Sequence, residues 1–138
     1  MRAVVDPNVL ISAVITPSGV TGQVARAALS RRFELVTCPR LIEELETVLR
    51  RPRFRQYLSI DEADDYVTSI EGVAHDADDP ADPEALSRDP DDDYLIALTR
   101  EAPADRLVTG DQDLLELEKP PVPIVSPRAL LDDLEARS

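Results

Sequence analysis

The sequence has 138 residues, 43% of them hydrophobic and 31% charged, which is typical of one globular domain rather than a disordered chain. No apolar run approaches the roughly 20 residues that cross a bilayer, and Asp6 interrupts the N-terminal apolar run where a signal peptide would continue. The net charge of −13 excludes nucleic-acid binding by bulk attraction, so such binding needs a local basic face or bridging metal ions.

Short β-branched runs alternate with helical patterns along the chain. Buried strands are predicted at residues 2–6, 33–37, 106–109 and 122–125. Helices are predicted after Pro7 and at about residues 20–30, 39–50, 60–73, 93–102, 111–118 and 127–136. The acid-rich stretch over residues 75–93 is predicted to begin as a loop and to end at a helix start. The fold class is therefore α/β: one domain over residues 1–138, in three layers α/β/α, with a central parallel sheet of four to five strands.

Two acids follow predicted strands at the places where helices begin. Asp6 follows the first strand, and Asp111 follows RLVTG at residues 106–110. In an open parallel sheet, ligands bind beyond the carboxyl ends of the strands where the topology switches direction, so these acids are candidates for one site. The alternative for each acid is an ordinary helix N-cap, and for either acid taken alone that interpretation is favoured.

Glu44 lies in a predicted helix with one apolar face, made by Leu41, Leu45, Val48 and Leu49. At about 100° per residue, Glu44 falls at the edge of that face, whereas Glu43 and Glu46 point elsewhere. Glu44 is thus the glutamate best placed to reach inward, and a surface position is its alternative.

Four further acids precede the next helix: Asp89, Asp91, Asp92 and Asp93. At least one of them is expected to cap that helix. A calcium-binding EF-hand is excluded there, because the positions that need glycine and glutamate hold Tyr94 and Arg100.

No other residue type forms a competing catalytic group. His75 is expected at the surface, and Cys38, the single cysteine, is expected in the core of a cytoplasmic protein. Lys119 precedes two prolines, and no phosphate-binding loop motif is present. A site made only of carboxylates selects Mg²⁺ or Mn²⁺, ions that position water against a phosphodiester.

Four segments, in this order, resemble the PIN-domain nucleases: VVDPNVLISA, LIEELETVLRRP, RDPDDDYLIALTR and LVTGDQDLL. The sequence is most similar to the branch of toxin components of toxin–antitoxin pairs, related to the VapC toxins. The resemblance implies a PIN-like fold and a Mg²⁺- or Mn²⁺-dependent endoribonuclease that hydrolyses single-stranded or structured RNA. It also implies a cognate antitoxin protein and a homodimer, with no membrane partner.

The resemblance also implies which residues act. The catalytic acids are Asp6, Glu44, Asp92 and Asp111, and the metal ligands are Asp6, Asp92, Asp111 and Asp113. Glu44 would help to bind the metal or orient the water. The register of the following helix favours Asp92 over Asp91 and Asp93 as the ligand, and this choice stays open.

Of three uncharged positions near these acids, two match the family and one departs from it. Asn8 and Thr109 match polar residues that support the site. The family usually has threonine where this chain has Pro7, which lacks both the hydroxyl and the backbone N–H. We therefore expect changed surroundings of the metal rather than an inactive site.

Four arginines follow the Glu44 helix and are candidates for RNA binding: Arg50, Arg51, Arg53 and Arg55. They would contact phosphates, or they could form a solvated basic rim or contact an acidic partner. Two alternatives to a nuclease stay open, and the first of them also clusters acids beyond parallel strands. One is a receiver-like regulatory module, for which Lys119 is poorly placed, and the other is a non-catalytic module that binds a partner.

Overall fold

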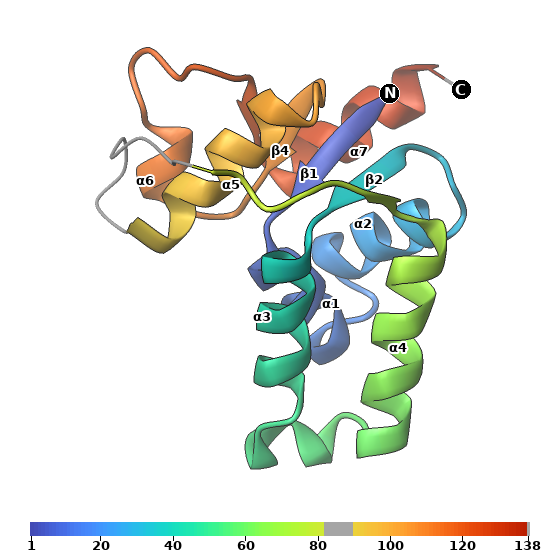
Figure 1. The fold of residues 1–138 in the computed structure, drawn as a ribbon. Helices are drawn as coiled ribbons and strands as arrows, with labels where there is room; N and C mark the ends of the chain where they lie inside the picture. The colour runs from blue at the N-terminus through green and yellow to red at the C-terminus, as the bar shows by residue number, and fades with distance from the viewer. Residues whose placement is uncertain (82–89, 138) are drawn as a thin grey trace.

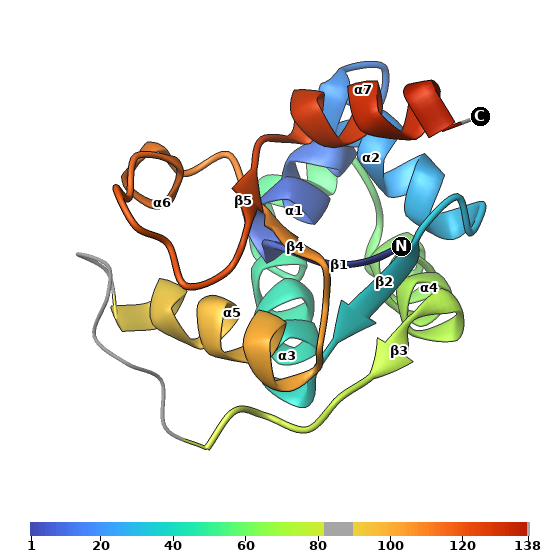
Figure 2. The same cartoon turned by 90° about the horizontal axis from the view of Figure 1, so that it is seen from above.

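The computed structural model describes residues 1–81 and 90–137, and within them the side chains of residues 1–81 and 94–137. The strands in these ranges are β1 (Arg2–Val5), β2 (Glu34–Thr37), β3 (His75–Asp76), β4 (Arg106–Val108) and β5 (Ile124–Val125). All neighbouring strands pair in parallel, in the order β3-β2-β1-β4-β5 (Figures 1 and 2). The predicted parallel sheet is confirmed, with five strands in the described part of the chain.

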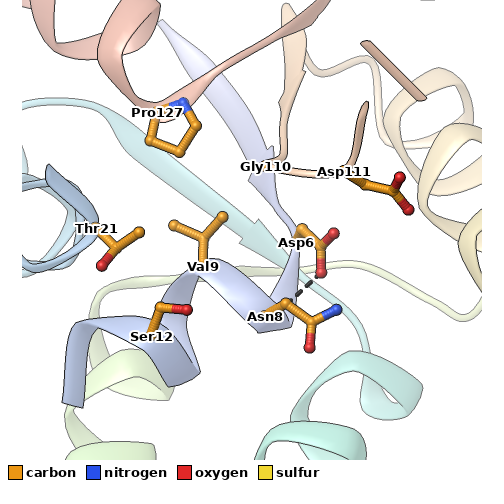
Figure 3. Close-up of a pocket in the computed structure, with 8 residues that line it drawn as sticks. All are labelled: Asp6, Asn8, Val9, Ser12, Thr21, Gly110, Asp111 and Pro127. Carbon is orange, nitrogen blue, oxygen red and sulfur yellow. Dashed lines mark hydrogen bonds between the residues drawn. The ribbon is translucent and has the colours of Figure 1, made fainter. Parts of the chain in front are cut away.

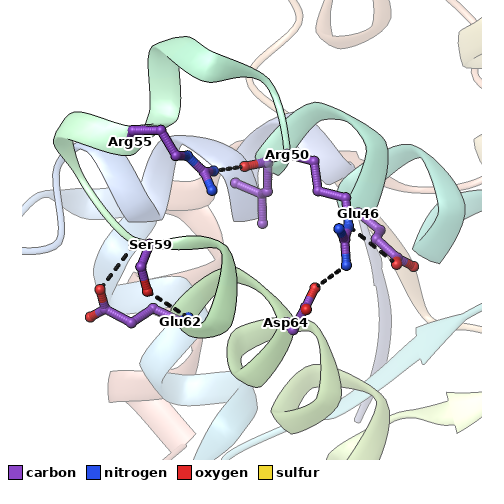
Figure 4. A network of polar contacts seen from close by, with 7 residues as sticks. Glu46, Arg50, Arg55, Ser59, Glu62 and Asp64 are labelled. Atoms are coloured by element: carbon purple, nitrogen blue, oxygen red, sulfur yellow. Dashed lines mark hydrogen bonds and ion pairs between the residues drawn. The ribbon is translucent and has the colours of Figure 1, made fainter.

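The helices in the described ranges follow the predicted order. They are α1 (Pro7–Ile15), α2 (Val20–Leu29), α3 (Pro39–Leu49), α4 (Ile60–Val73), α5 (Pro90–Glu101), α6 (Gln112–Leu115) and α7 (Pro127–Arg137), with a 3₁₀ helix η1 (Pro52–Gln56) between α3 and α4. Proline occupies the first turn of α1 and α3, where its missing N–H has no intrahelical partner to lose. Helix α4 begins at a complete capping box between Ser59 and Glu62 (Figure 4).

Several predicted boundaries differ from the structure: α5 begins at Pro90 instead of residue 93, and β5 begins at Ile124 instead of residue 122. Helix α6 ends at Leu115 instead of continuing to residue 118, and the chain then approaches Pro120 and Pro121, which disfavour a preceding helix. Strand β3 lies inside the stretch predicted to begin as a loop. Its residues, His75 and Asp76, are polar and exposed, so no apolar pattern in the sequence predicts a strand there. The strand forms by pairing with Val36 and Thr37 of β2.

Alternate residues of the strands face two separate cores, which makes the fold a three-layer α/β/α sandwich. Ala3 and Val5 belong to the cluster that residues of α1, α2, α3, α4 and α7 complete. Val4 belongs to the opposite cluster, which residues of α5 and α6 complete. In the view from above, α2 and α7 lie on one side of the sheet and α5 on the other (Figure 2). Along the residues that the structure describes, no helix is both long and apolar enough to cross a membrane.

The strand order places the topological switch between β1 and β4. The chain builds β1, β2 and β3 in one direction across the sheet and then returns to add β4 and β5 on the other side of β1. Val5 pairs with Val108, so the next residues, Asp6 and Thr109, leave the sheet side by side. This edge is where ligands bind in open parallel sheets.

Candidate active site

Asp6 is a buried carboxylate whose two oxygens both accept hydrogen bonds. Its side chain is 2% exposed and caps α1: Oδ1 accepts the backbone N–H of Asn8 at 2.9 Å. Oδ2 accepts the hydroxyl of Thr109 at 2.8 Å, and the Asp6 N–H donates to the Val108 carbonyl at 2.9 Å. The capping role and a place in a shared site are therefore compatible, because a different oxygen serves each contact.

Asp111 is joined to Asp6 through the same threonine. The N–H of Asp111 donates to Thr109 Oγ1 at 3.1 Å, while that hydroxyl donates to Asp6. Asp111 also caps α6, since its Oδ1 accepts the N–H of Asp113 at 2.9 Å. Asp113 itself is exposed. The structure therefore brings two predicted acids together across 105 positions of sequence.

The surroundings of Asp6 disfavour its ionised form when no cation is present. Burial raises the pKa of Asp6, and the nearby Asp111 carboxylate raises it further, against the opposing effect of the bonds from Asn8 and Thr109. A carboxylate that is fixed, buried and close to another negative charge gains from a bound cation. The donors present are oxygens, which suit Mg²⁺ or Mn²⁺.

A pocket of about 370 Å³ opens beside these acids (Figure 3). It is lined by Asp6, Asn8, Val9, Ser12, Thr21, Gly110, Asp111 and Pro127. In Figure 3, Asp6 and Asp111 emerge from neighbouring strand ends, whereas Ser12 and Thr21 lie on the opposite side of the pocket. The sequence reasoning missed these two hydroxyls, because a serine and a threonine on helices carry no pattern that distinguishes them from surface residues.

Glu44 occupies a second pocket, also of about 370 Å³, on α3. The residues that line it are Arg40, Glu43, Glu44, Thr47, Val48 and Arg51. Glu44 is half-buried while Glu43 and Glu46 are exposed, which matches the side of the helix predicted for it. Its Oε2 accepts the hydroxyl of Tyr94 at 2.8 Å. Glu44 is thus joined to α5 by this hydrogen bond, and the pocket that it lines is a different one from the pocket beside Asp6 and Asp111.

The Asp92 side chain, with those of Asp91 and Asp93, lies outside the part of the chain whose side chains the structure describes. Among the side chains that are described, no three acidic, histidine or cysteine groups gather as a metal cluster. The third proposed metal ligand thus stays a prediction from the sequence, placed at the start of α5.

The four predicted RNA-binding arginines have different surroundings. Arg50 pairs with Glu46 at 3.6 Å and with Asp64 at 2.6 Å, and Arg55 donates to the Leu49 carbonyl (Figure 4). The Arg53 guanidinium lies 4.9 Å from the centre of the Phe54 ring. Arg51 lines the Glu44 pocket. Of the four, Arg51 is therefore the one that the structure places beside a candidate catalytic acid.

The two residues predicted to have no catalytic role lie where they were expected. His75 is exposed, with Nδ1 3.7 Å from a Glu34 oxygen. Cys38 is buried, and its burial raises the pKa of the thiol to about 11, which disfavours a reactive thiolate.

Comparisons with known proteins agree with this architecture. The chain matches the family model described as PIN domain over residues 2–113. It is 27% identical over 117 residues to the uncharacterized protein MJ1680 of Methanocaldococcus jannaschii. The aligned region covers 85% of this chain and 75% of that protein. The crystal structure of PAE2754 from Pyrobaculum aerophilum is similar in fold, with a TM-score of 0.68 and 17% identity over 99% of this chain and 90% of that one. The chain belongs to the PIN-domain family, whose members are generally nucleases and typically use divalent metal ions.

Proposed function

We propose that this chain is a Mg²⁺- or Mn²⁺-dependent endoribonuclease that hydrolyses phosphodiester bonds in single-stranded or structured RNA. The observation that carries the proposal is the bridge from Asp6 through the Thr109 hydroxyl to Asp111, at the switch point of the sheet. Membership of the PIN-domain family supports the reaction class, because PIN domains are generally nucleases.

A divalent cation fits the residues of this site. We assign it to Asp6, Asp92 and Asp111, with Asp113 as a further candidate. The raised pKa of Asp6, which burial causes and Asp111 reinforces, supports the assignment, since a bound positive charge would favour the ionised form of Asp6. When bound, the ion would lower the pKa of a water molecule and stabilise negative charge on the phosphate.

The protein's own residues would fix the geometry of the reaction. The Asn8 N–H and the Thr109 hydroxyl hold the Asp6 carboxylate in one orientation before any ligand arrives. Glu44 would help to bind the ion or orient the attacking water through Oε1, because Oε2 accepts the bond from Tyr94. Arg51, in the same pocket as Glu44, would contact an RNA phosphate.

The proposal extends to a toxin role, as the VapC-like member of a toxin–antitoxin pair that acts as a homodimer. The net charge of −13 supports it, because a strongly acidic chain suits a partner that offers basic side chains to its acidic pocket. Expression of this chain alone should arrest growth, and co-expression of a neighbouring gene should relieve the arrest. Unimpaired growth on expression of active enzyme would contradict the toxin role and leave the nuclease proposal standing.

The nuclease proposal is tested with purified protein, labelled RNA, and Mg²⁺ or Mn²⁺. The wild type should cleave, chelation of the metal should stop cleavage, and Asp6→Asn should lower the rate by about 1,000-fold or more with its circular dichroism unchanged. The matched control is Asp65→Asn, an exposed aspartate of α4. Cleavage that survives Asp6→Asn would identify a contaminant or another site, and metal binding without cleavage would favour the non-catalytic module.

A further inference from the structure

Tyr94 joins the two helices that carry the remaining predicted acids. It lies in α5, two residues after Asp92, and is 1% exposed. Its hydroxyl donates to Glu44 Oε2 at 2.8 Å, across 50 positions of sequence. This hydrogen bond ties the carboxylate of α3 to the first turns of α5.

Helix α3 contacts the Tyr94 ring as well as its hydroxyl. The guanidinium carbon of Arg40 lies 4.0 Å from the centre of the ring, a distance typical of a cation–π contact. Arg40 precedes Glu44 by one helical turn, so both side chains emerge from the same face of α3. The Arg40 N–H donates to Asp79 Oδ1 at 2.8 Å, which anchors the start of this helix. Tyr94 is therefore held by its ring and offers its hydroxyl from a fixed position.

We propose that Tyr94 is a positioning residue that fixes the Glu44 carboxylate for catalysis. A glutamate side chain has several rotatable bonds, and a half-buried one without a partner would spread over several rotamers. The bond to Tyr94 occupies Oε2, so Oε1 would be the oxygen that serves the proposed role toward the metal or the attacking water. The inference rests on the proposed nuclease function and deepens it, since Tyr94 acts through Glu44 and touches neither substrate nor metal.

The first test removes only the hydroxyl. Tyr94→Phe keeps the ring, its packing and the contact with Arg40, so the fold should survive. We expect kcat for RNA cleavage to fall about tenfold with KM unchanged, because positioning acts on the reaction and not on RNA binding. The matched control is Tyr66→Phe, which removes another hydroxyl, one that donates at 2.8 Å to the Leu10 carbonyl. This variant should keep full activity.

The second test repeats the change where Glu44 is absent. In a Glu44→Ala background, Tyr94→Phe should cause no further loss of activity, since the hydroxyl then has no carboxylate to hold. A loss of the same size in both backgrounds would overturn the inference, because it would mean that Tyr94 acts through packing.

A third measurement needs neither RNA nor metal. The wild type, Tyr94→Phe, Glu44→Ala and the double variant are unfolded in urea. Tyr94→Phe should raise the unfolding equilibrium constant about fivefold more when residue 44 is glutamate than when it is alanine. Equal effects in the two backgrounds would show that the hydroxyl does not hold Glu44. If the wild type fails to cleave RNA, the nuclease proposal fails, and this unfolding cycle still decides whether Tyr94 positions Glu44.

Discussion

Two aspartates at the carboxyl edge of this sheet each accept a hydrogen bond from the hydroxyl of a threonine at the end of the neighbouring strand. Asp6 follows β1 and accepts from Thr109 at 2.8 Å, whereas Asp76 ends β3 and accepts from Thr37 at 3.3 Å. Both threonines are fully buried. The aspartates differ, because Asp6 is 2% exposed and Asp76 is exposed to solvent.

The sheet topology explains this difference. The strands β1 and β4 are central, and helices begin directly after Asp6 and Asp111, so backbone and side chains surround the Asp6 carboxylate. Strand β3 is a two-residue edge strand with solvent beside it. The same local pair is thus desolvated at the switch point and hydrated at the edge. Only the desolvated carboxylate lies where a neighbouring charge or a bound cation has a large effect.

Metal binding should separate the two pairs most strongly. Asp6→Asn removes a fixed carboxylate from the proposed cation site, and we expect Mn²⁺ affinity to fall by about 100-fold or more. Asp76→Asn should leave the affinity unchanged, because water already solvates that carboxylate. Calorimetric titration with Mn²⁺ measures both variants. Equal losses would mean that the two edges are equivalent, and the assignment of the metal to Asp6 would then be wrong.

Removal of the threonine hydroxyls should produce the next largest contrast. In Thr109→Val, Asp6 loses a donor and the Asp111 N–H loses an acceptor, which should cost about 1–3 kcal/mol of stability and lower RNA cleavage about tenfold. In Thr37→Val, the lost bond is longer and its partner is exposed, so less than about 0.5 kcal/mol is expected. Urea unfolding compares the two variants. A similar cost at both sites would contradict the proposed effect of burial.

The central half of this comparison could be predicted from the sequence. The apolar runs at Ala3–Val5 and Leu107–Val108 indicate buried strands, and parallel strands direct their carboxyl ends to one edge. Asp6 and Asp111 follow those runs, which made them candidates for one site, and the adjacency of β1 and β4 in the structure brings them together. The PIN-like fold was predicted from the resemblance of four segments to that family, two of which contain Asp6 and Asp111.

The remaining features depend on contacts that no local pattern encodes. Strand β3 consists of two polar residues and forms by pairing with β2, so no local pattern predicts it. The hydrogen bond from Thr37 to Asp76 was therefore not predicted. The bond from Tyr94 to Glu44 depends on how α3 and α5 pack, and helical periodicity alone predicted only the side on which Glu44 lies. The different surroundings of Arg51, Arg50 and Arg55 likewise depend on tertiary contacts, since Arg50 pairs with Asp64 of α4 and Arg55 donates to the Leu49 carbonyl at the end of α3.

The smallest expected effect has the opposite sign to the others and concerns the metal-free protein. Burial raises the pKa of Asp6 above its ordinary value of 3.8, so the folded state holds the Asp6 proton more tightly than the unfolded state. The resulting stability is fully present below that value and is lost as the pH rises through the folded-state pKa. At neutral pH, Asp6→Asn should therefore be more stable to urea than the wild type by roughly 1 kcal/mol. Uncharged asparagine can accept the Asn8 N–H through Oδ1 and donate through Nδ2 to the Thr109 hydroxyl, which reverses the direction of that second hydrogen bond. This stability advantage of Asp6→Asn should shrink as the pH falls toward 4, and saturating Mn²⁺ should reverse it by stabilising only the wild type.

Asp76→Asn, the control for this prediction, should change stability by less than about 0.5 kcal/mol under the same conditions. A destabilised Asp6→Asn protein at neutral pH without metal would mean that the Asp6 charge stabilises the fold, and that the switch-point carboxylate is a structural cap like any other.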